Sequence, residues 1–435
     1  MPGFDIWQKN AANDQHSTKI CSVCNGGEEM KNRLPLEGLK VVELATVVAT
    51  PISARLLSDY GAEVIKVEAP RGDLLRMTGV WHMLPTEDDN NPLFDLCNTG
   101  KKMITVDMKT EEGMKIFHRL LSEADIFLSN VRVQSLRRMK IDYDSIKEQY
   151  PSLIYAHFSG FGLKGEDANK PGYDSTAFWM RTGATTDITT PGSFPIRPSF
   201  AMGDIATASE FVAAILMAVI GRHKTGEGCM VTTSLLQSGI WCNAVAVMNA
   251  QPQYGKEYPV ERFRPGNPMS DYYECSDGEY MALSQNDYVK DKQLFVELFD
   301  FPELTQDPDL DTLGTMAESG KIPFVAKKMQ EEFLKHSSKE WDQILTEHDV
   351  PHELAGHFKN TYLDPQARAM DAFDEVSYRG DAVTAIPRPP FEISGFGRRP
   401  FEKTGAMGRD TDEVLRDLGY SEKEIKQMRE AGSVW

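Results

Sequence analysis

The sequence predicts an α/β protein whose larger domain is a Rossmann-like parallel sheet with helices on both faces. Short apolar runs of strand length recur between residues 39 and 158, and segments with helical spacing lie between them. Strands that alternate with helices at this spacing favour a parallel sheet. Short strands followed by amphipathic helices at residues 272–348 predict a second, smaller α+β domain.

The first part of the chain supplies five predicted strands and two predicted helices. The strands are expected at residues 39–44, 62–68, 104–107, 125–130 and 153–158. The helices are expected at 51–61 and 110–123, because apolar residues recur there at helical spacing: Ile52, Leu56, Leu57 and Tyr60 in the first, and Met114, Phe117, Leu120 and Leu121 in the second. Pro51 suits the first turn of its helix.

The rest of the chain continues with helices and a few short strands. Residues 206–220 predict a buried apolar helix, residues 224–265 a helical connector, and residues 272–283 short strands. Asp410 and Thr411 open a helix that Gly419 ends, and Ser421 with Glu424 forms a capping box that opens the last helix. These patterns divide the chain into an N-terminal extension at 1–34, a large domain at 35–223, a linker at 224–265, a small domain at 266–348 and a C-terminal return to the large domain at 349–435.

Composition excludes several classes of protein. The chain has 435 residues, 41% hydrophobic and 26% charged, so it is expected to fold. Its net charge of −18 argues against nucleic acid and anionic membranes as partners. The longest apolar run, residues 211–220, is short for a membrane span, and the N-terminus lacks a signal-peptide pattern. Six scattered cysteines among 20 methionines indicate a reduced protein, so we expect it to be soluble and cytoplasmic.

Three motifs that resemble ligand sites lack the context that such sites need. Gly160–Gly165 has the G-x-G-x-x-G spacing but is followed by loop residues rather than a helix, so dinucleotide binding is not expected. His352 and His357 are five residues apart, too far around a helix to share one metal. Cys21 and Cys24 form a lone C-x-x-C without a second ligand pair. No metal site is predicted.

The segment around Asp204 has two interpretations. Asp204 follows Gly203 just ahead of the apolar helix, so it could simply be the helix N-cap, which is the commoner role of aspartate there. It could also be a nucleophilic carboxylate near the helix N-terminus, whose amides would stabilise an oxyanion. On this second interpretation Gly203 leaves room for a thioester to approach.

Basic residues concentrate after several predicted strands, despite the acidic total. They are Arg71, Arg76, Lys101, Lys102, Lys109, Arg132, Arg137, Arg138 and Lys140. Open α/β sheets bind ligands at the carboxyl ends of their strands. This concentration therefore predicts a ligand that carries phosphate.

Many ordered motifs resemble those of the class III (CaiB/BaiF) CoA-transferases, from about residue 35 to the C-terminus. They are Leu36–Leu44, Gly61–Glu68, Gly72-Asp73 with Arg76, Asn98 with Lys101-Lys102, Asp107–Lys109, Asn130, Ser159–Gly162, Pro171–Asp174, Met202–Asp204, Lys224–Gly228 and Arg409–Leu415. The resemblance implies a large coenzyme A-binding domain made of both chain ends, a small domain, and a homodimer of two interlocked chains.

The resemblance also assigns the chemistry. Asp204 occupies the position of the nucleophile, which would form an aspartyl anhydride and then an aspartyl-CoA thioester while coenzyme A passes from an acyl-CoA to a carboxylic acid. Coenzyme A is then a substrate, and no tightly bound cofactor is implied. The implied coenzyme A contacts are Thr46, Val47, Ala49, Arg76, Lys102, Lys109, Asn130, Arg138 and Asp174.

Departures from the family pattern bear on the substrate. Formyl-CoA-type members carry His and Gln where this chain has Thr46 and Val48, and a glycine-rich lid where it has Arg264–Met269, so oxalate and formate are not expected. The pattern is closer to the phenyllactate and 2-hydroxyisocaproate CoA-transferases of amino-acid fermentation. A carnitine- or bile-acid-type transferase and a 2-methylacyl-CoA racemase remain alternatives, although Tyr173 stands where the racemases have a histidine.

Overall fold

The computed structural model describes residues 33–380 and 382–435. Cys21 and Cys24 lie outside the described residues. The chain divides into two compact units, and each is described by itself. The first comprises residues up to Phe158 together with Ala208–Thr232 and Asp374–Trp435, and the second comprises Ser159–Thr207 and Thr233–Phe373.

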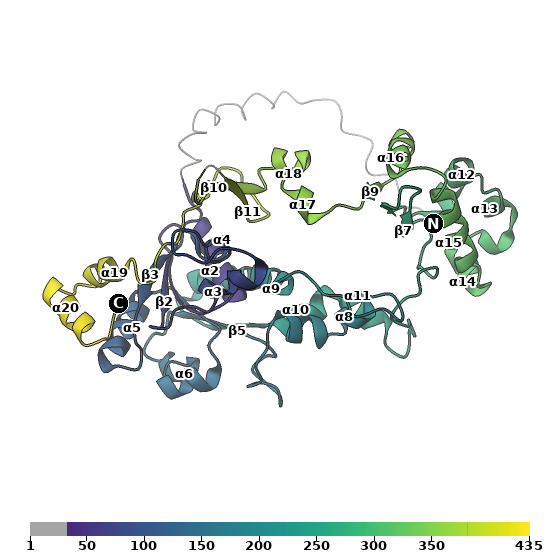
Figure 1. Cartoon of the computed structure of the whole chain (residues 1–435). Helices are drawn as coiled ribbons and strands as arrows, with labels where there is room; N and C mark the ends of the chain where they lie inside the picture. The colour runs from purple at the N-terminus through teal and green to yellow at the C-terminus, as the bar shows by residue number, and fades with distance from the viewer. Residues whose placement is uncertain (1–32, 381) are drawn as a thin grey trace, which may run out of the picture. The chain divides into compact units, whose positions relative to one another are not determined.

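The first unit is built on a six-stranded sheet in the order β3-β2-β1-β4-β5-β6. Figure 1 labels β2, β3 and β5 of this sheet. β1 pairs in parallel with β2 and β4, β2 with β3, and β4 with β5, which confirms the predicted parallel sheet. The chain order reverses between β1 and β4, so this pair forms the topological switch point of the sheet. The strands are β1 (Lys40–Leu44), β2 (Glu63–Glu68), β3 (Lys102–Thr105), β4 (Ile126–Ser129), β5 (Ile154–Ser159) and β6 (Met230–Ser234).

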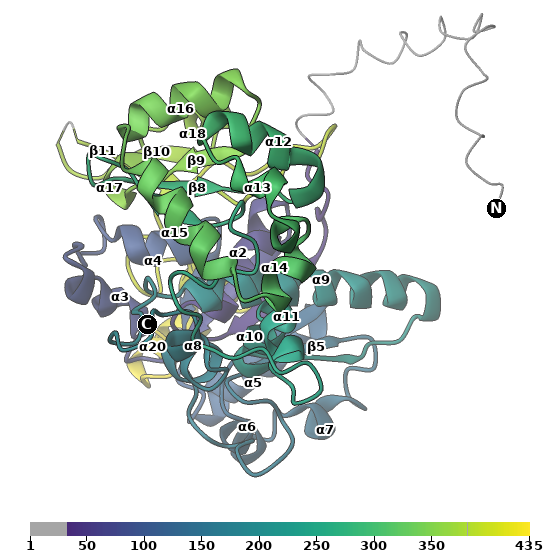
Figure 2. The same ribbon diagram turned by 90° about the vertical axis from the view of Figure 1, so that its right-hand side faces the viewer.

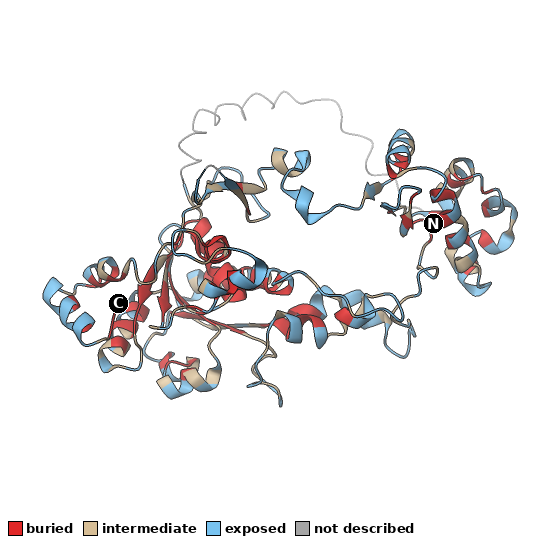
Figure 3. Ribbon diagram, in the orientation of Figure 1, coloured by how far each residue is buried: buried red, intermediate tan, exposed pale blue. Residues whose placement is uncertain are grey.

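Helices cover both faces of this sheet, as predicted. Val41 and Val42 are neighbours on β1 and point to opposite faces, and both are buried. The helices between β1 and β5 are α2 (Ala49–Asp59), α3 (Leu75–Thr78), the 3₁₀-helix η2 (Gly79–His82), α4 (Pro92–Asn98), α5 (Glu111–Glu123), α6 (Val133–Met139) and α7 (Tyr143–Ile146). The core on the Val42 face includes apolar residues of α5, α6 and α7, and of two helices near the C-terminus, α19 (Thr411–Asp417) and α20 (Glu422–Glu430). Strands β1 to β5 are buried along most of their length (Figure 3), whereas β6 is buried only at Ser234.

The last residues of the chain return to the first unit. β10 (Phe373–Ser377) and β11 (Val383–Pro387) form a two-stranded sheet, and α19 (Thr411–Asp417) and α20 (Glu422–Glu430) follow. The predicted capping box is present, because Ser421 and Glu424 exchange side-chain and backbone hydrogen bonds. Val434 forms a bridge with Val106 just after β3. Both chain ends therefore build the first unit.

Helix α9 (Met202–Thr225) is longer than the predicted helix at 206–220. Its mean hydropathy of 1.7 and its length would allow it to cross a membrane on those two criteria alone, which core helices also meet. Phe211 and Ile215 are fully buried, and the Phe211 ring packs edge-on against Phe158. These contacts are those of a core helix, as the sequence predicted.

The segment predicted as a helical connector contains a strand. Residues 230–234 form β6, and only then follow α10 (Leu235–Cys242) and α11 (Ala244–Asn249). Helical spacing does not separate a five-residue edge strand from a flanking helix turn, because so short a run shows less than two turns of periodicity. Ser234 ends the strand and caps α10 by accepting a hydrogen bond from the Gln237 amide.

The second unit contains a three-stranded antiparallel sheet, β7-β8-β9, with its own apolar core. Figure 2 labels β8 and β9 of this sheet. Its strands are β7 (Tyr272–Glu274), β8 (Tyr280–Leu283) and β9 (His352–Leu354), so the sheet extends past residue 348, where its domain was predicted to end. Its helices are the π-helix η3 (Asp174–Met180), α8 (Ala184–Asp187), α12 (Tyr288–Leu298), α13 (Glu303–Gln306), the 3₁₀-helix η4 (Pro308–Leu310), α14 (Leu313–Glu318), α15 (Ile322–Phe333), α16 (Ser338–Glu347), α17 (Phe358–Thr361) and α18 (Pro365–Ala369).

Candidate active site

The loops after β1 and β4 meet at the switch point of the sheet in the first unit. The side-chain amide of Asn130, just after β4, binds the backbone of Thr46, just after β1. Asn130 Oδ1 accepts from the Thr46 amide at 3.1 Å, and Asn130 Nδ2 donates to the Thr46 carbonyl at 2.8 Å. Asn130 thus fixes the position of residues 45–48, which we call the β1 loop. A crevice beside this switch point is where open α/β sheets bind ligands.

The β1 loop has an unusual backbone conformation at its centre. Val47 has φ +69°, in the left-handed region that β-branched residues rarely adopt. Its amide donates to Asp73 Oδ1 at 2.9 Å. Ala49 then begins α2, and its side chain is buried. The loop is therefore held from two sides, by Asn130 and by Asp73.

Cations follow three of the strands at this edge of the sheet. Arg71 lies after β2, Lys109 after β3, and Arg132 and Arg138 after β4, and all four are exposed. Carboxyl ends of parallel strands share one edge of a sheet, so these charges are available to a phosphate-bearing ligand there. Arg138 Nη2 donates to Ser135 within α6.

Arg76 is engaged more deeply than the sequence suggested. Its guanidinium binds the buried carboxylate of Glu68, at 2.7 Å to Oε1 and 2.9 Å to Oε2, and stacks over the Phe94 ring at 4.0 Å from the centroid. Burial by itself would raise the pKa of Glu68, but the contact with Arg76 favours the ionised carboxylate, and the pKa of Glu68 is lowered as a result. Arg76 is mostly covered, so its charge is compensated within the protein.

Lys102 lies at the opposite edge of the sheet and Lys101 is buried beneath the β1 loop, so the prediction is wrong in counting them among the exposed cations at the ligand-binding edge. Lys102 begins β3, at the amino ends of the strands, and contacts three carboxylates: Glu63, Glu413 and Asp417. The Lys101 side chain is fully buried and forms an ion pair with Glu43 at 2.7 Å. Sequence proximity to a strand does not tell which of its ends a residue occupies.

Asp204 lies in the first turn of α9, within the second unit. The helix begins at Met202, so Asp204 is not its N-cap, and the simpler of the two interpretations fails. The Asp204 residue is only 9% exposed. Burial first, and the like charge of Asp174 second, raise the pKa of Asp204 to about 7. This carboxylate is therefore a buried group with a raised pKa rather than a surface cap, and such groups are candidates for functional sites.

Asp174 organises the start of α9. Its Oδ1 accepts a hydrogen bond from the Asp204 amide at 3.0 Å, and the Gly203 amide also bonds to its carboxylate. Asp174 opens the π-helix η3, a rare form that occurs mostly at functional sites. Its pKa is raised by burial, against the effect of these amides. The sequence suggested that Asp174 contacts coenzyme A, whereas the structure shows it holding the backbone of the candidate nucleophile.

The space beside Gly203 is filled by the protein itself. A Cβ atom at this position would overlap Asp174 Oδ1 and the Phe178 ring. The expectation that Gly203 leaves room for a thioester is therefore wrong, since the glycine instead lets η3 and α9 pack together. Gly160 and Gly172 pack backbone against backbone in the same way, and no helix opens at Gly160–Gly165.

A group of buried charges beside the β1 loop was assigned no role from the sequence. Lys66 Nζ forms ion pairs with Glu43 at 2.9 Å and with Asp73 at 3.0 Å. Asp73 was noted only as part of a motif. A signal did exist, because Glu43 and Lys66 each interrupt an apolar strand, and charges in buried strands are rare unless they are paired.

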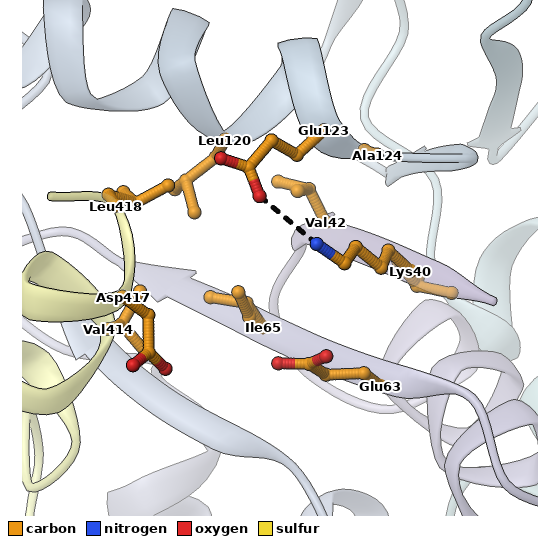
Figure 4. A pocket seen from close by; sticks show the side chains of 11 residues that line it. Lys40, Val42, Glu63, Ile65, Leu120, Glu123, Ala124, Val414, Asp417 and Leu418 are labelled. Atoms are coloured by element: carbon orange, nitrogen blue, oxygen red, sulfur yellow. Dashed lines mark hydrogen bonds and ion pairs between the residues drawn. The ribbon is translucent and has the colours of Figure 1, made fainter. Parts of the chain in front are cut away.

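A separate cavity of about 250 Å³ opens at the amino ends of β1 and β2 (Figure 4). Its lining includes Val42, Ile65 and Leu120, with Lys40, Glu63 and Asp417 among the charged residues. Lys40 is paired with Glu123 at 3.0 Å. This cavity lies at the edge of the sheet opposite the β1 loop, so it is not part of the candidate site.

Comparison with known proteins agrees with this geometry. The model of CoA-transferase family III matches residues 36–411. An (R)-2-hydroxy-4-methylpentanoate CoA-transferase of Clostridioides difficile is 35% identical over 396 residues, which cover 91% of this chain and 98% of the relative. A cinnamoyl-CoA:phenyllactate CoA-transferase of Clostridium sporogenes is 31% identical over 392 residues, which cover 90% and 95%.

Solved structures of similar fold extend the comparison. A CAIB/BAIF family protein from Brucella suis superposes with a TM-score of 0.72 at 26% identity, covering 89% of this chain and all of that one. A hypothetical protein from Mycobacterium tuberculosis superposes with a TM-score of 0.75 at 25% identity, covering 88% of this chain and all of that one.

Proposed function

The chain belongs to CoA-transferase family III, and from this premise we propose that it transfers coenzyme A reversibly between an acyl-CoA and a 2-hydroxy carboxylic acid. The proposal rests above all on one observation: Asp204 is a buried carboxylate with a raised pKa, held in place through its own amide. The names of two relatives support the class of acid, because one acts on 2-hydroxy-4-methylpentanoate and the other on phenyllactate.

The proposed reaction begins when the Asp204 carboxylate attacks the thioester carbonyl. The C–S bond breaks, coenzyme A leaves as a thiolate, and a mixed anhydride forms on Asp204. The thiolate then attacks Cγ of Asp204, which releases the donor acid and leaves an aspartyl-CoA thioester. The acceptor carboxylate displaces the thiolate from that thioester, and the thiolate attacks the new acyl carbonyl, which regenerates Asp204.

The burial of Asp204 favours these steps energetically. A charged carboxylate is penalised when it is removed from water, and this penalty is what raises its pKa. Acylation converts the buried anion into a neutral anhydride or thioester, so forming the intermediate relieves the penalty. The same burial keeps water away from the anhydride, which would otherwise hydrolyse.

In this proposal coenzyme A binds at the switch point of the sheet in the first unit. The contacts would come from the β1 loop at Thr46 and Val47, from the start of α2 at Ala49, and from the exposed cations Lys109 and Arg138. Asn130 would act through the loop, since its side-chain amide binds the Thr46 backbone. Lys102 is not part of this contact set, and Arg76 would contribute only beside its partner Glu68.

The surroundings of Asp204 along the chain suit an apolar acyl group. Met202 is 54% exposed and Ile205 is 43% exposed, on either side of Gly203 and Asp204. The exposed apolar residues Met180, Ile188 and Phe194 belong to the same part of the second unit. We therefore propose a branched or aromatic 2-hydroxy acid, with a 2-enoyl-CoA or another short to medium acyl-CoA as donor.

We also propose that the working form is a homodimer. Trp241 on α10 is 73% exposed, and Val245 on α11 is 68% exposed. Large apolar side chains that gather on neighbouring helices mark interaction surfaces. Sedimentation at several concentrations, with Trp241→Lys as the interface variant, tests this part of the proposal independently of activity.

The function is tested by trapping the intermediate. The protein is incubated with an acyl-CoA and then with hydroxylamine or borohydride, and the peptides are analysed by mass spectrometry. Modification of Asp204 is the expected result, and modification only elsewhere would contradict the proposed chemistry. In D₂O without an acceptor acid, a racemase would exchange the α-proton of a 2-methylacyl-CoA, whereas the proposed transferase leaves it in place.

A further inference from the structure

Buried acidic and basic side chains that form ion pairs with one another lie beneath the β1 loop. Glu43 and Lys66 face each other on β1 and β2 as register partners, and both side chains are fully buried. Lys66 Nζ donates to Glu43 Oε1 at 2.9 Å and to the Ala45 carbonyl at 2.8 Å. It also forms an ion pair with Asp73 Oδ2 at 3.0 Å. A buried lysine thus contacts the first residue of the loop directly, as well as a carboxylate that faces the loop.

Asp73 connects Lys66 to Val47, at the centre of the β1 loop. While its Oδ2 faces Lys66, its Oδ1 accepts the amides of Val47 at 2.9 Å and Leu75 at 3.0 Å. Its own amide donates to Glu68 Oε2 at 2.9 Å. The carboxylate is therefore fixed by three partners and the backbone amide of Asp73 by a fourth, and one of the three is the amide of Val47, the residue with positive φ.

The backbone of Val47 needs such a restraint. Left-handed backbone is unfavourable for a β-branched residue and persists only where its surroundings over-determine it. Without the Asp73 carboxylate, the Val47 amide loses its acceptor, and the residue is free to return to an extended conformation. Asn130 holds only the neighbouring Thr46, so it does not fix the φ angle of Val47.

The same group of buried charges also contacts the first turn of α2. Glu43 Oε2 lies 2.7 Å from Lys101 Nζ, and Lys101 Nζ donates to the Pro51 carbonyl at 2.8 Å and to Asn98 Oδ1 at 2.9 Å. Pro51 lies in the first turn of α2, two residues after Ala49. One buried group of charges therefore restrains both the β1 loop and the helix that follows it.

We propose that Asp73, oriented by Lys66, is a positioning residue that holds the β1 loop in the conformation that binds coenzyme A. This inference rests on the proposed function, in which that loop contacts the cofactor moiety of the substrate. Burial opposes a charge on Lys66, but Glu43 and Asp73 outweigh it and raise its pKa. Lys66 therefore stays charged where it contacts Asp73, whereas burial lowers the pKa of Lys101 in the same group to about 8.

The test measures binding of free coenzyme A to the full chain by calorimetry. Asp73→Ala is expected to bind about tenfold to a hundredfold more weakly than the unmodified protein, because the loop is no longer pre-organised. Adding Val47→Gly to Asp73→Ala is expected to restore a large part of the affinity, since glycine adopts positive φ without strain. A role in stability alone would not be rescued in this way.

A matched control removes another buried carboxylate of the first unit. Asp374 accepts hydrogen bonds from Arg388 at 2.9 Å and Arg398 at 2.7 Å, away from the β1 loop in sequence. Asp374→Ala is expected to lower the unfolding temperature and to leave coenzyme A affinity within about twofold. If Asp73→Ala does not fold, the double variant Lys66→Met, Asp73→Leu, which removes the acceptor for the Val47 amide without leaving the charge of Lys66 facing an empty site, is measured in its place.

The outcomes separate the two proposals. Equal affinity in the unmodified protein and the Asp73 variant would overturn the positioning role, and so would a lack of rescue by Val47→Gly. If the unmodified protein itself binds no coenzyme A, the proposed function fails, and the positioning role fails with it.

Discussion

The amide of Asp204 donates a hydrogen bond to Oδ1 of Asp174, thirty residues earlier in the chain, at 3.0 Å. The bond places two carboxylates beside each other at the start of α9. One of them fixes the backbone, and the other has its pKa raised to about 7 by burial and by its neighbour. The pair of Asp174 and Asp204 therefore sets both the position of the Asp204 backbone and the raised pKa of the Asp204 carboxylate.

Replacing Asp174 is expected to separate these two effects. Asp174→Ala removes the acceptor for the Asp204 amide, so kcat should fall about tenfold to a hundredfold. Asp174→Asn keeps an oxygen acceptor and should lose less. Both variants remove a like charge, so both should move the acidic limb of the pH–rate profile to lower pH. Steady-state rates between pH 5 and 9 measure both effects, and equal losses in the two variants would argue against the hydrogen bond.

The pH dependence of the reaction follows from the pKa of Asp204. In the proposed reaction only the ionised carboxylate of Asp204 attacks the thioester, and its pKa in the folded protein is raised to about 7. We expect kcat/KM to rise about tenfold per pH unit below pH 7 and to level off above it. A profile that is flat from pH 5 to 8 would contradict this assignment.

The stability of the protein should also depend on Asp204. The pKa of Asp204 is about 7 in the folded protein and 3.8 in the unfolded chain, so the free energy of unfolding falls as the pH rises from 3.8 to about 7. Above pH 7 the full energetic cost of the buried charge is present. Asp204→Asn removes this cost. The unfolding temperature of that variant should exceed the wild-type value by about 2–5 °C at pH 8 and by less at pH 5. Calorimetry at the two pH values checks the sign, and an inactive variant that is less stable at pH 8 would refute it.

Two glycines of α9 provide a matched pair of substitutions. A Cβ at Gly203 would overlap Asp174 and Phe178, whereas one at Gly221 meets no atom within 4 Å. Gly203→Ala should therefore displace Asp204 and reduce kcat by at least about a hundredfold. Gly221→Ala should keep full activity and be as stable or slightly more stable, because alanine favours helix. Similar activities of the two variants would show that the packing at Gly203 is not needed.

The sequence predicted the positions of those strands and helices that follow from a local pattern of apolar residues. The strands at 62–68 and 125–130 are apolar runs, and the helix at 110–123 has a clear apolar face, so their positions were predicted within one residue. β3 was placed two residues late, because the apolar run starts after Lys102 although pairing with β2 starts at Lys102 itself. Asp204 was proposed as the nucleophile by resemblance and not from a physical pattern, since an aspartate beside a helix start is usually a cap.

The rest of the site depends on contacts between distant residues. Nothing near Val47 signals a positive φ, because the carboxylate that binds its amide lies 26 residues later. Lys101 and Lys102 are neighbours in sequence, yet one is buried beside Glu43 and the other lies among surface carboxylates. The role of Asp174 could likewise not be predicted from the sequence, because its hydrogen-bond partner, the Asp204 amide, lies thirty residues later in the chain.

The packing of residues 410–434 against β3 has a consequence for biosynthesis. Met103 of β3 donates its amide to Asp410, and Val106 pairs with Val434. Until these residues have left the ribosome, a nascent chain lacks the segment that covers this edge of the sheet, and β3 stays uncovered. Removing residues 410–434 should therefore leave this strand open to pairing with other chains.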